Sequence, residues 1–88
     1  MLNCMFGEKI TEQRARLELT TVVMAELYGV PLVTYQKWVS SGKERRDPGA
    51  ATYKLYEVLT MLEVVAPAIL NNLIEEAIES VRKRRIKR

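Results

Sequence analysis

The stretch "AELYGVPLVTYQKW", residues 25–38, contains a break between two short segments that favour helix. The first segment ends at Tyr28 and is followed by Gly29, which adopts a positive φ without a steric penalty. Pro31 comes two residues later and suits the first turn of a new helix, because it has no N–H to lose there. The sequence therefore predicts two helices joined by a turn of about three residues.

Composition favours one small globular domain without catalytic chemistry. Of the 88 residues, 48% are hydrophobic and 28% are charged, which is typical of a globular chain. The chain has no histidine, and Cys4 is its single cysteine. The commonest general base, the commonest zinc ligand and an internal disulfide are therefore missing. We expect no catalytic residue, no metal and no cofactor.

The hydropathy pattern favours a cytoplasmic protein that makes no membrane contact. No apolar run approaches the roughly 20 residues that a membrane-spanning helix needs. The first eight residues, "MLNCMFGE", lack the charged start and long apolar stretch of a signal peptide.

Positive charge is concentrated in two places. Residues 1–81 contain eight basic and eleven acidic side chains, a net charge of −3. Residues 82–88 contain six basic side chains and no acid, and residues 29–46 have a local charge of +3. Residues 29–46 are thus a basic region within an otherwise acidic domain. A surface that faces phosphates needs such a basic region.

Hydrophobic periodicity is helical throughout, and the alternation typical of strands never persists. We expect an all-α fold, a compact bundle of five helices, with residues 1–65 as one domain and 66–88 as a C-terminal helix with a basic tail. Thr20 is a good N-cap for the second helix, and Asp47 with Pro48 is a start signal for the fourth. The predicted helices span about residues 8–17, 20–28, 31–41, 48–65 and 68–85.

Apolar spacing predicts which side chains face the core. On the fourth helix the expected buried face has steps of four and three residues: Ala51, Leu55, Val58, Leu62 and Val65. On the second and third helices the expected inward side chains are Met24, Ala25, Tyr28, Tyr35, Trp38 and Val39.

Two helices joined by a short turn that contains glycine form a helix-turn-helix, whose second helix fits the major groove of DNA. The steric requirements of that motif can be checked in the sequence. Ala25 is the small residue that a close helix crossing needs, and Val30 is the apolar residue that fills the corner. Tyr35 and Trp38 supply the bulky apolar side chains that pack the second helix on the first.

The text "RARLELTTVVMAELYGVPLVTYQKWVSSGK", followed by "DPGAATYKLYEVLTML", resembles the Cro/CI-type (XRE) family of helix-turn-helix regulators. The resemblance covers roughly residues 9–65. The positions that match the family's frame are Arg14, Ala25, Gly29, Val30, Trp38, Gly42, Lys43 and Pro48. The chain departs from the family at Pro31, where a Ser or Thr cap is usual, and at Thr21, where a glutamine commonly contacts a phosphate.

The resemblance implies a set of DNA-contacting residues. The surface that reads bases would be residues 32–37, which include Leu32, Val33, Thr34, Gln36 and Lys37. Gln36 would pair with adenine, Lys37 with guanine, and Leu32 or Val33 would meet a thymine methyl group. Phosphates would be held by Thr21, Lys43, Arg45 and Arg46. An ordinary solvated face at Gln36 and Lys37, and core packing at Leu32 and Val33, are the alternatives.

The last helix has an apolar stripe too wide for one contact surface. Its members are Ile69, Leu70, Leu73, Ile74, Ala77, Ile78 and Val81. We expect part of the stripe to pack on the fourth helix and part to meet a second copy of the chain, with a helix wrapped wholly on its own core as the alternative. The tail "RKRRIKR" suits DNA phosphates and a frayed, solvated terminus equally, and basic runs also occur in RNA-binding and nuclear-import segments.

The function expected from these features is a homodimeric repressor that binds double-stranded DNA at an inverted-repeat operator, with half-sites one turn apart. Such small repressors occur in bacteria, phages and mobile elements, and anti-CRISPR-associated repressors belong to the wider group. The alternative is an antitoxin whose apolar last helix binds a toxin as partner protein. A third possibility is a binder of structured RNA that uses the basic tail.

Overall fold

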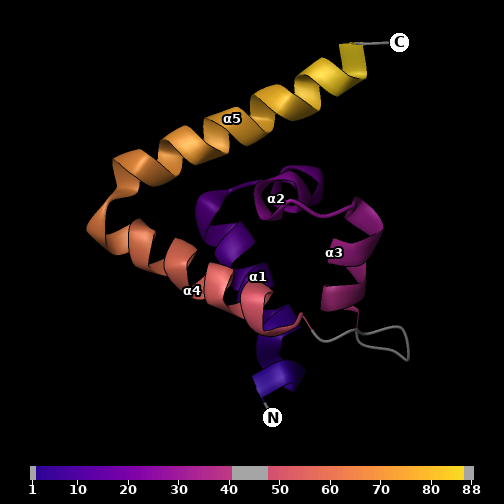
Figure 1. Cartoon of the computed structure of the whole chain (residues 1–88), viewed down its shortest axis with the longest axis vertical. Coiled ribbons are helices and arrows are strands. Elements are labelled where there is room, and N and C mark those ends of the chain that lie inside the picture. The colour runs from indigo at the N-terminus through magenta and orange to yellow at the C-terminus, as the bar shows by residue number, and fades with distance from the viewer. Residues whose placement is uncertain (1, 41–47, 87–88) are drawn as a thin grey trace.

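Five α-helices and no strand form residues 2–40 and 48–86, the part of the chain that the computed structural model describes. The helices are α1 (Leu2–Leu17), α2 (Thr21–Tyr28), α3 (Leu32–Val39), α4 (Ala50–Val65) and α5 (Pro67–Ile86). In Figure 1, α4 and α5 form a V, α5 passes over α2, and α3 lies at the opposite side of the molecule from the corner of the V. The expectation of an all-α fold is confirmed.

Helix α1 begins at Leu2, six residues before the predicted start at Glu8, so that prediction is wrong. The reason is the role of Phe6 and Gly7. Phe6 is buried, and a Cβ atom built on Gly7 would lie 2.6 Å from the carbonyl oxygen of Trp38. Glycine weakens a helix, but here it allows the backbones of α1 and α3 to approach closely.

Helix α4 also begins elsewhere than predicted. Its N-cap is Gly49, with a φ of 85° in the region that favours glycine. The N–H of Tyr53 donates to the Gly49 carbonyl oxygen at 3.1 Å. Pro48 therefore precedes the helix instead of occupying its first turn, and the predicted cap Asp47 lies outside the described residues.

An aromatic cluster around Phe6 forms the centre of the core. The Phe6 ring lies 5.7 Å from the Trp38 ring and 5.9 Å from the rings of Tyr53 and Tyr56. Trp38 in turn lies 6.0 Å from Tyr28. Phe6–Tyr53 is a tilted pair, and the other three pairs meet edge to face. Edge-to-face contacts at these distances stabilise by about 0.5–1.5 kcal/mol each beyond the area they bury. The cluster joins α1, α2, α3 and α4.

The predicted buried face of α4 is only partly correct. Leu55 and Leu62 pack against the core, but Ala51, Val58 and Val65 are exposed. The most deeply buried side chain of α4 is Leu59. The period of the pattern was right and its phase was wrong, because Tyr53 and Tyr56 pack against Phe6 and turn α4 by part of a turn.

A buried polar network connects α1, α2 and α4. Gln13 is fully buried; its Oε1 accepts a hydrogen bond from the Tyr28 hydroxyl at 2.6 Å, and its Nε2 donates to Thr60 Oγ1 at 3.1 Å. Burial raises the pKa of Tyr28 well above its ordinary value. The neutral phenol therefore contributes its full stability below pH about 10, and that contribution is lost as the pH rises through the raised pKa.

A bidentate ion pair on the surface adds a second link between α1 and α4. Arg16 Nε and Nη2 donate to the two carboxylate oxygens of Glu63 at 2.8 and 3.0 Å. This pair raises the pKa of Arg16 above its usual value.

We expect Gly7→Ala to destabilise the chain. The added methyl group must push the Trp38 carbonyl, which is backbone and cannot swing aside, so the cost should be about 1–3 kcal/mol despite the better helix propensity of alanine. Urea denaturation followed by circular dichroism measures it. An unchanged or raised midpoint would show that α1 and α3 do not meet at Gly7.

Removal of the Tyr28 hydroxyl should also destabilise the fold. In Tyr28→Phe the Oε1 of Gln13 loses its partner while buried, which costs about 1–3 kcal/mol. Replacing the amide as well, in Tyr28→Phe with Gln13→Leu, removes the unpaired acceptor and should recover part of the loss. A double-mutant cycle from urea denaturation checks this coupling, and strict additivity would argue against the network.

Candidate nucleic-acid interface

The turn between α2 and α3 is built by backbone hydrogen bonds at Gly29. This residue adopts the left-handed conformation, with φ 72° and ψ 31°. Its N–H donates to the Glu26 carbonyl, and the N–H of Val30 donates to the Ala25 carbonyl, both at 3.0 Å. This is the glycine-dependent Schellman ending of a helix. The predicted turn is confirmed, and Pro31 caps α3 from just outside its first turn.

The other end of α2 is capped as expected. Thr20 Oγ1 accepts a hydrogen bond from the Val23 N–H at 3.3 Å, which satisfies one of the free donors at a helix start. Met24, Ala25 and Tyr28 are buried. The small side chain of Ala25 lies next to the turn, where α2 and α3 pack together.

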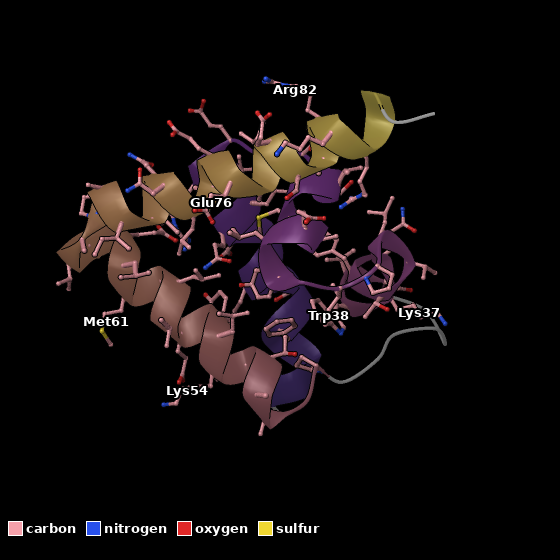
Figure 2. The ribbon with its side chains drawn as sticks, turned by 45° about the horizontal axis from the view of Figure 1, so that its top comes forward. Lys37, Trp38, Lys54, Met61, Glu76 and Arg82 are labelled. Carbon is pink, nitrogen blue, oxygen red and sulfur yellow. The ribbon has the colours of Figure 1, made fainter. Side chains whose placement is uncertain are left out.

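Helix α3 has one buried face and one exposed face. Tyr35 and Trp38 are buried, as predicted, whereas Val33 is 56% exposed and Gln36 is also exposed. Figure 2 shows the contrast between neighbours: Trp38 lies within the molecule and Lys37 reaches outward from α3. The exposed face therefore combines an apolar side chain, an amide and an amine on one short helix.

The remaining predicted DNA contacts fall into three groups. Thr21, the first residue of α2, and Thr34 are partly exposed. Leu32 is half-buried and packs against the core. Of its two expected roles, thymine contact and core packing, the structure supports core packing. Lys43, Arg45 and Arg46 lie outside the described residues.

The end of α5 lies beside α2 and the start of α3, a feature that sequence reasoning missed. Arg84 Nη1 forms an ion pair with Glu26 Oε1 on α2. Both side chains line an open hollow of about 460 Å³ that also includes Leu32 at the start of α3. The excess of basic residues at 82–88 was the available signal, but the sequence does not show that this segment contacts α2.

The last turns of α5 also expose basic side chains. Arg82, Lys83 and Arg84 are all exposed, and the last turns of α5 lie on the same side of the molecule as α3 in Figure 1. Arg82 also pairs with Glu79 at 3.3 Å. Helix α5 continues to Ile86, so residues 82–86 of the predicted tail are helical.

A buried hydroxyl lies behind the exposed face of α3. The Tyr35 hydroxyl has no hydrogen-bond partner among the described residues. Burial raises the pKa of Tyr35, and the guanidinium of Arg14 opposes that shift. Arg14 Nη1 itself donates to the Leu19 carbonyl at 3.0 Å. This hydrogen bond ties the connection between α1 and α2 to the side of α1.

The predicted dimerisation stripe divides between core and surface. Leu70, Ile74, Ala77 and Val81 are buried within the single chain, and Ile78 packs partly against the core. Ile69 and Leu73 are the exposed members, at 54% and 38%. A contact with another molecule through α5 therefore has only Ile69 and Leu73 available from that stripe.

These two residues belong to a larger exposed apolar area, here named the corner patch. It consists of Val58, Met61, Val64, Val65, Ile69 and Leu73, from the second half of α4 and the first half of α5. Val64 is 82% exposed and Val65 is 71% exposed. Figure 2 shows Met61 pointing away from the molecule. The sequence analysis had assigned Val58 and Val65 to the core, which is why it missed this patch.

Comparison with known proteins finds no match: no family model fits the chain, and no curated protein or solved structure is significantly similar to it. None of the helices in residues 2–40 and 48–86 combines the length and the apolar character needed to cross a bilayer. The same part of the chain contains no group of three or more side chains suited to hold a metal ion.

Proposed function

We propose that the chain is a regulator that binds double-stranded DNA by inserting α3 into the major groove. The observation that carries the proposal is the two-faced character of α3. Tyr35 and Trp38 anchor one side in the core, and Val33, Gln36 and Lys37 are left on the other. A rigidly held helix with outward amide, amine and methyl groups suits the hydrogen-bond and apolar pattern of base edges.

The turn and the charge distribution support the same proposal. The left-handed Gly29 and the small Ala25 allow α2 and α3 to pack as a helix-turn-helix requires. The last turns of α5 lie on the same side of the molecule as α3 in Figure 1, and they carry the exposed basic side chains Arg82, Lys83 and Arg84, which suit the phosphate backbone. A homodimeric repressor at an inverted-repeat operator is the form of regulator we propose, because one short helix reads only a few base pairs.

The corner patch favours one alternative, an antitoxin that binds DNA and also a partner protein. Six exposed apolar side chains form a surface of the kind that marks protein interaction sites. The two functions differ in purified protein. A stable chain that binds operator DNA alone supports the repressor, whereas a chain that requires a co-purifying protein for stability supports the antitoxin.

Gln36→Ala should relax sequence preference without unfolding the chain. Loss of a bidentate contact should cost about 1–3 kcal/mol at one base pair and little at others. Asn71→Ala is the matched control, because it removes an exposed amide from α5. Selection of bound sequences from a random duplex library, followed by anisotropy titrations, measures both. If Gln36→Ala and Asn71→Ala leave the same preference as the wild type, α3 is not the base-reading helix.

Binding should also depend strongly on salt. Six to ten phosphate contacts release enough counterions to weaken binding by about 10³–10⁵-fold between roughly 50 and 200 mM salt. Lys83→Ala should reduce the slope of log affinity against log salt by about one and weaken all sequences alike. Titrations at four or five salt concentrations provide the slope. Binding that is insensitive to salt would contradict the proposal.

A further inference from the structure

The corner patch is bounded by opposite charges at its two ends. On α4, Val58, Met61 and Val65 follow Lys54 at steps of four, three and four residues, which places all four on one helix face. On α5, Ile69 and Leu73 are followed by Glu76 at steps of four and three. Lys54 and Glu76 are both exposed. The surface is thus apolar along its middle, with an amine at one end and a carboxylate at the other.

The sequence of groups along the patch, from amine through apolar side chains to carboxylate, is self-complementary: it matches a second copy that runs in the opposite direction. A two-fold axis that crosses the middle of the patch turns the second copy end for end. Lys54 of one copy then faces Glu76 of the other, and the apolar side chains meet between them. An isologous contact needs such self-complementarity. Lys54 has an intrahelical partner, Glu57 at 3.5 Å, but exposed pairs of this kind are weak and do not hold the amine in place.

The number and exposure of the apolar side chains in the patch also suit a second copy. Apolar areas above a few hundred Å² are rare on monomers, and a standard interface covers about 800 Å² per partner. Six large aliphatic or thioether side chains, several of them more than half exposed, supply the apolar centre of an interface of that class. From these observations we infer that two copies of the chain pair through the corner patch, with the α4 and α5 helices of both copies in contact.

This pairing has a consequence for DNA binding that rests on the proposed function. Helix α3 lies at the opposite side of the molecule from the corner of the V (Figure 1), and the molecule measures 37 Å by 36 Å in its two longer directions. The two α3 helices therefore lie at the outer ends of the dimer. Half-sites should be separated by more than one helical turn of about 34 Å, in contrast to the expectation from sequence.

Charge exchange between two variants tests the pairing without DNA. Lys54→Glu places two carboxylates at each end of the interface, and Glu76→Lys places two amines there. Each variant alone should dimerise about tenfold more weakly than the wild type, because two attractive pairs become repulsive. A mixture of the two variants restores both attractions in a heterodimer. Sedimentation equilibrium on each variant and on the 1:1 mixture measures the three dissociation constants.

The result expected is weak self-association of each variant and near wild-type association of the mixture. A mixture that associates no better than its components would overturn the end-for-end pairing. A wild-type chain that is monomeric at about 100 μM would show that the corner patch does not bind a second copy. The partner of the patch would then be another protein. Because these measurements contain no DNA, a failure of the proposed function would not change their outcome.

A second variant tests the apolar centre. Met61→Glu puts a carboxylate where the side chain is 61% exposed in the single chain, so the fold should persist while the dimer dissociates. Ala15→Glu, on the exposed surface of α1, is the control for added negative charge and should stay dimeric. Helicity from circular dichroism accompanies the sedimentation. A dimer of wild-type affinity in Met61→Glu would show that the corner patch is not the interface.

Discussion

The packing of Trp38 against Phe6 decides the orientation of α3, and with it the outward surface of the molecule. Their rings meet edge to face at 5.7 Å, and Gly7, next to Phe6, lets the α1 backbone approach the Trp38 carbonyl. Once Trp38 and Tyr35 are buried, helical geometry leaves Val33 and Gln36 on the opposite side. A helix of only eight residues has little stability of its own, so this packing also keeps α3 helical.

The sequence predicted the local features of the fold well because they depend on single residues. Thr20 as a cap, Gly29 as a left-handed turn, and the burial of Tyr35 and Trp38 all follow from short-range chemistry. The phase of α4 could not be predicted in the same way. Its apolar residues outnumber those that one face can bury, and the choice among them depends on Phe6, some 50 residues earlier in the chain.

The candidate site was predictable to a similar degree. The exposed face of α3 follows from the positions of its two buried aromatics, so Gln36 and Lys37 could be proposed in advance. The contact between Arg84 and Glu26 joins residues 58 positions apart, and no local pattern predicts such a contact. The division of the α5 stripe was also beyond the sequence, since Leu73 and Ile74 are neighbours and only the packed structure shows which one is buried.

Helix α5 connects the two ends of the molecule. Its first half contributes Ile69 and Leu73 to the corner patch, and its inward side contributes Leu70 and Ile74 to the same core as α1, α2 and α3. Its last turns reach α2 beside the start of α3. The predicted division at residue 65 falls between α4 and α5, but the core is continuous across it. A change in how α5 packs would therefore affect the corner patch and the α3 side together.

Under the proposed function, the ion pair between Arg84 and Glu26 has an electrostatic role in addition to its place in the packing. Glu26 is on α2 beside the hollow at the start of α3, where a bare carboxylate would repel an approaching phosphate. Arg84 offsets that charge locally, and Arg82 and Lys83 add positive charge nearby. Surface pairs contribute little to stability, but the sign of the field over a binding face governs the encounter with a polyanion. This ion pair therefore matters more for the charge beside the start of α3 than for the stability of the fold, whereas α5 stabilises the fold through its buried apolar side chains.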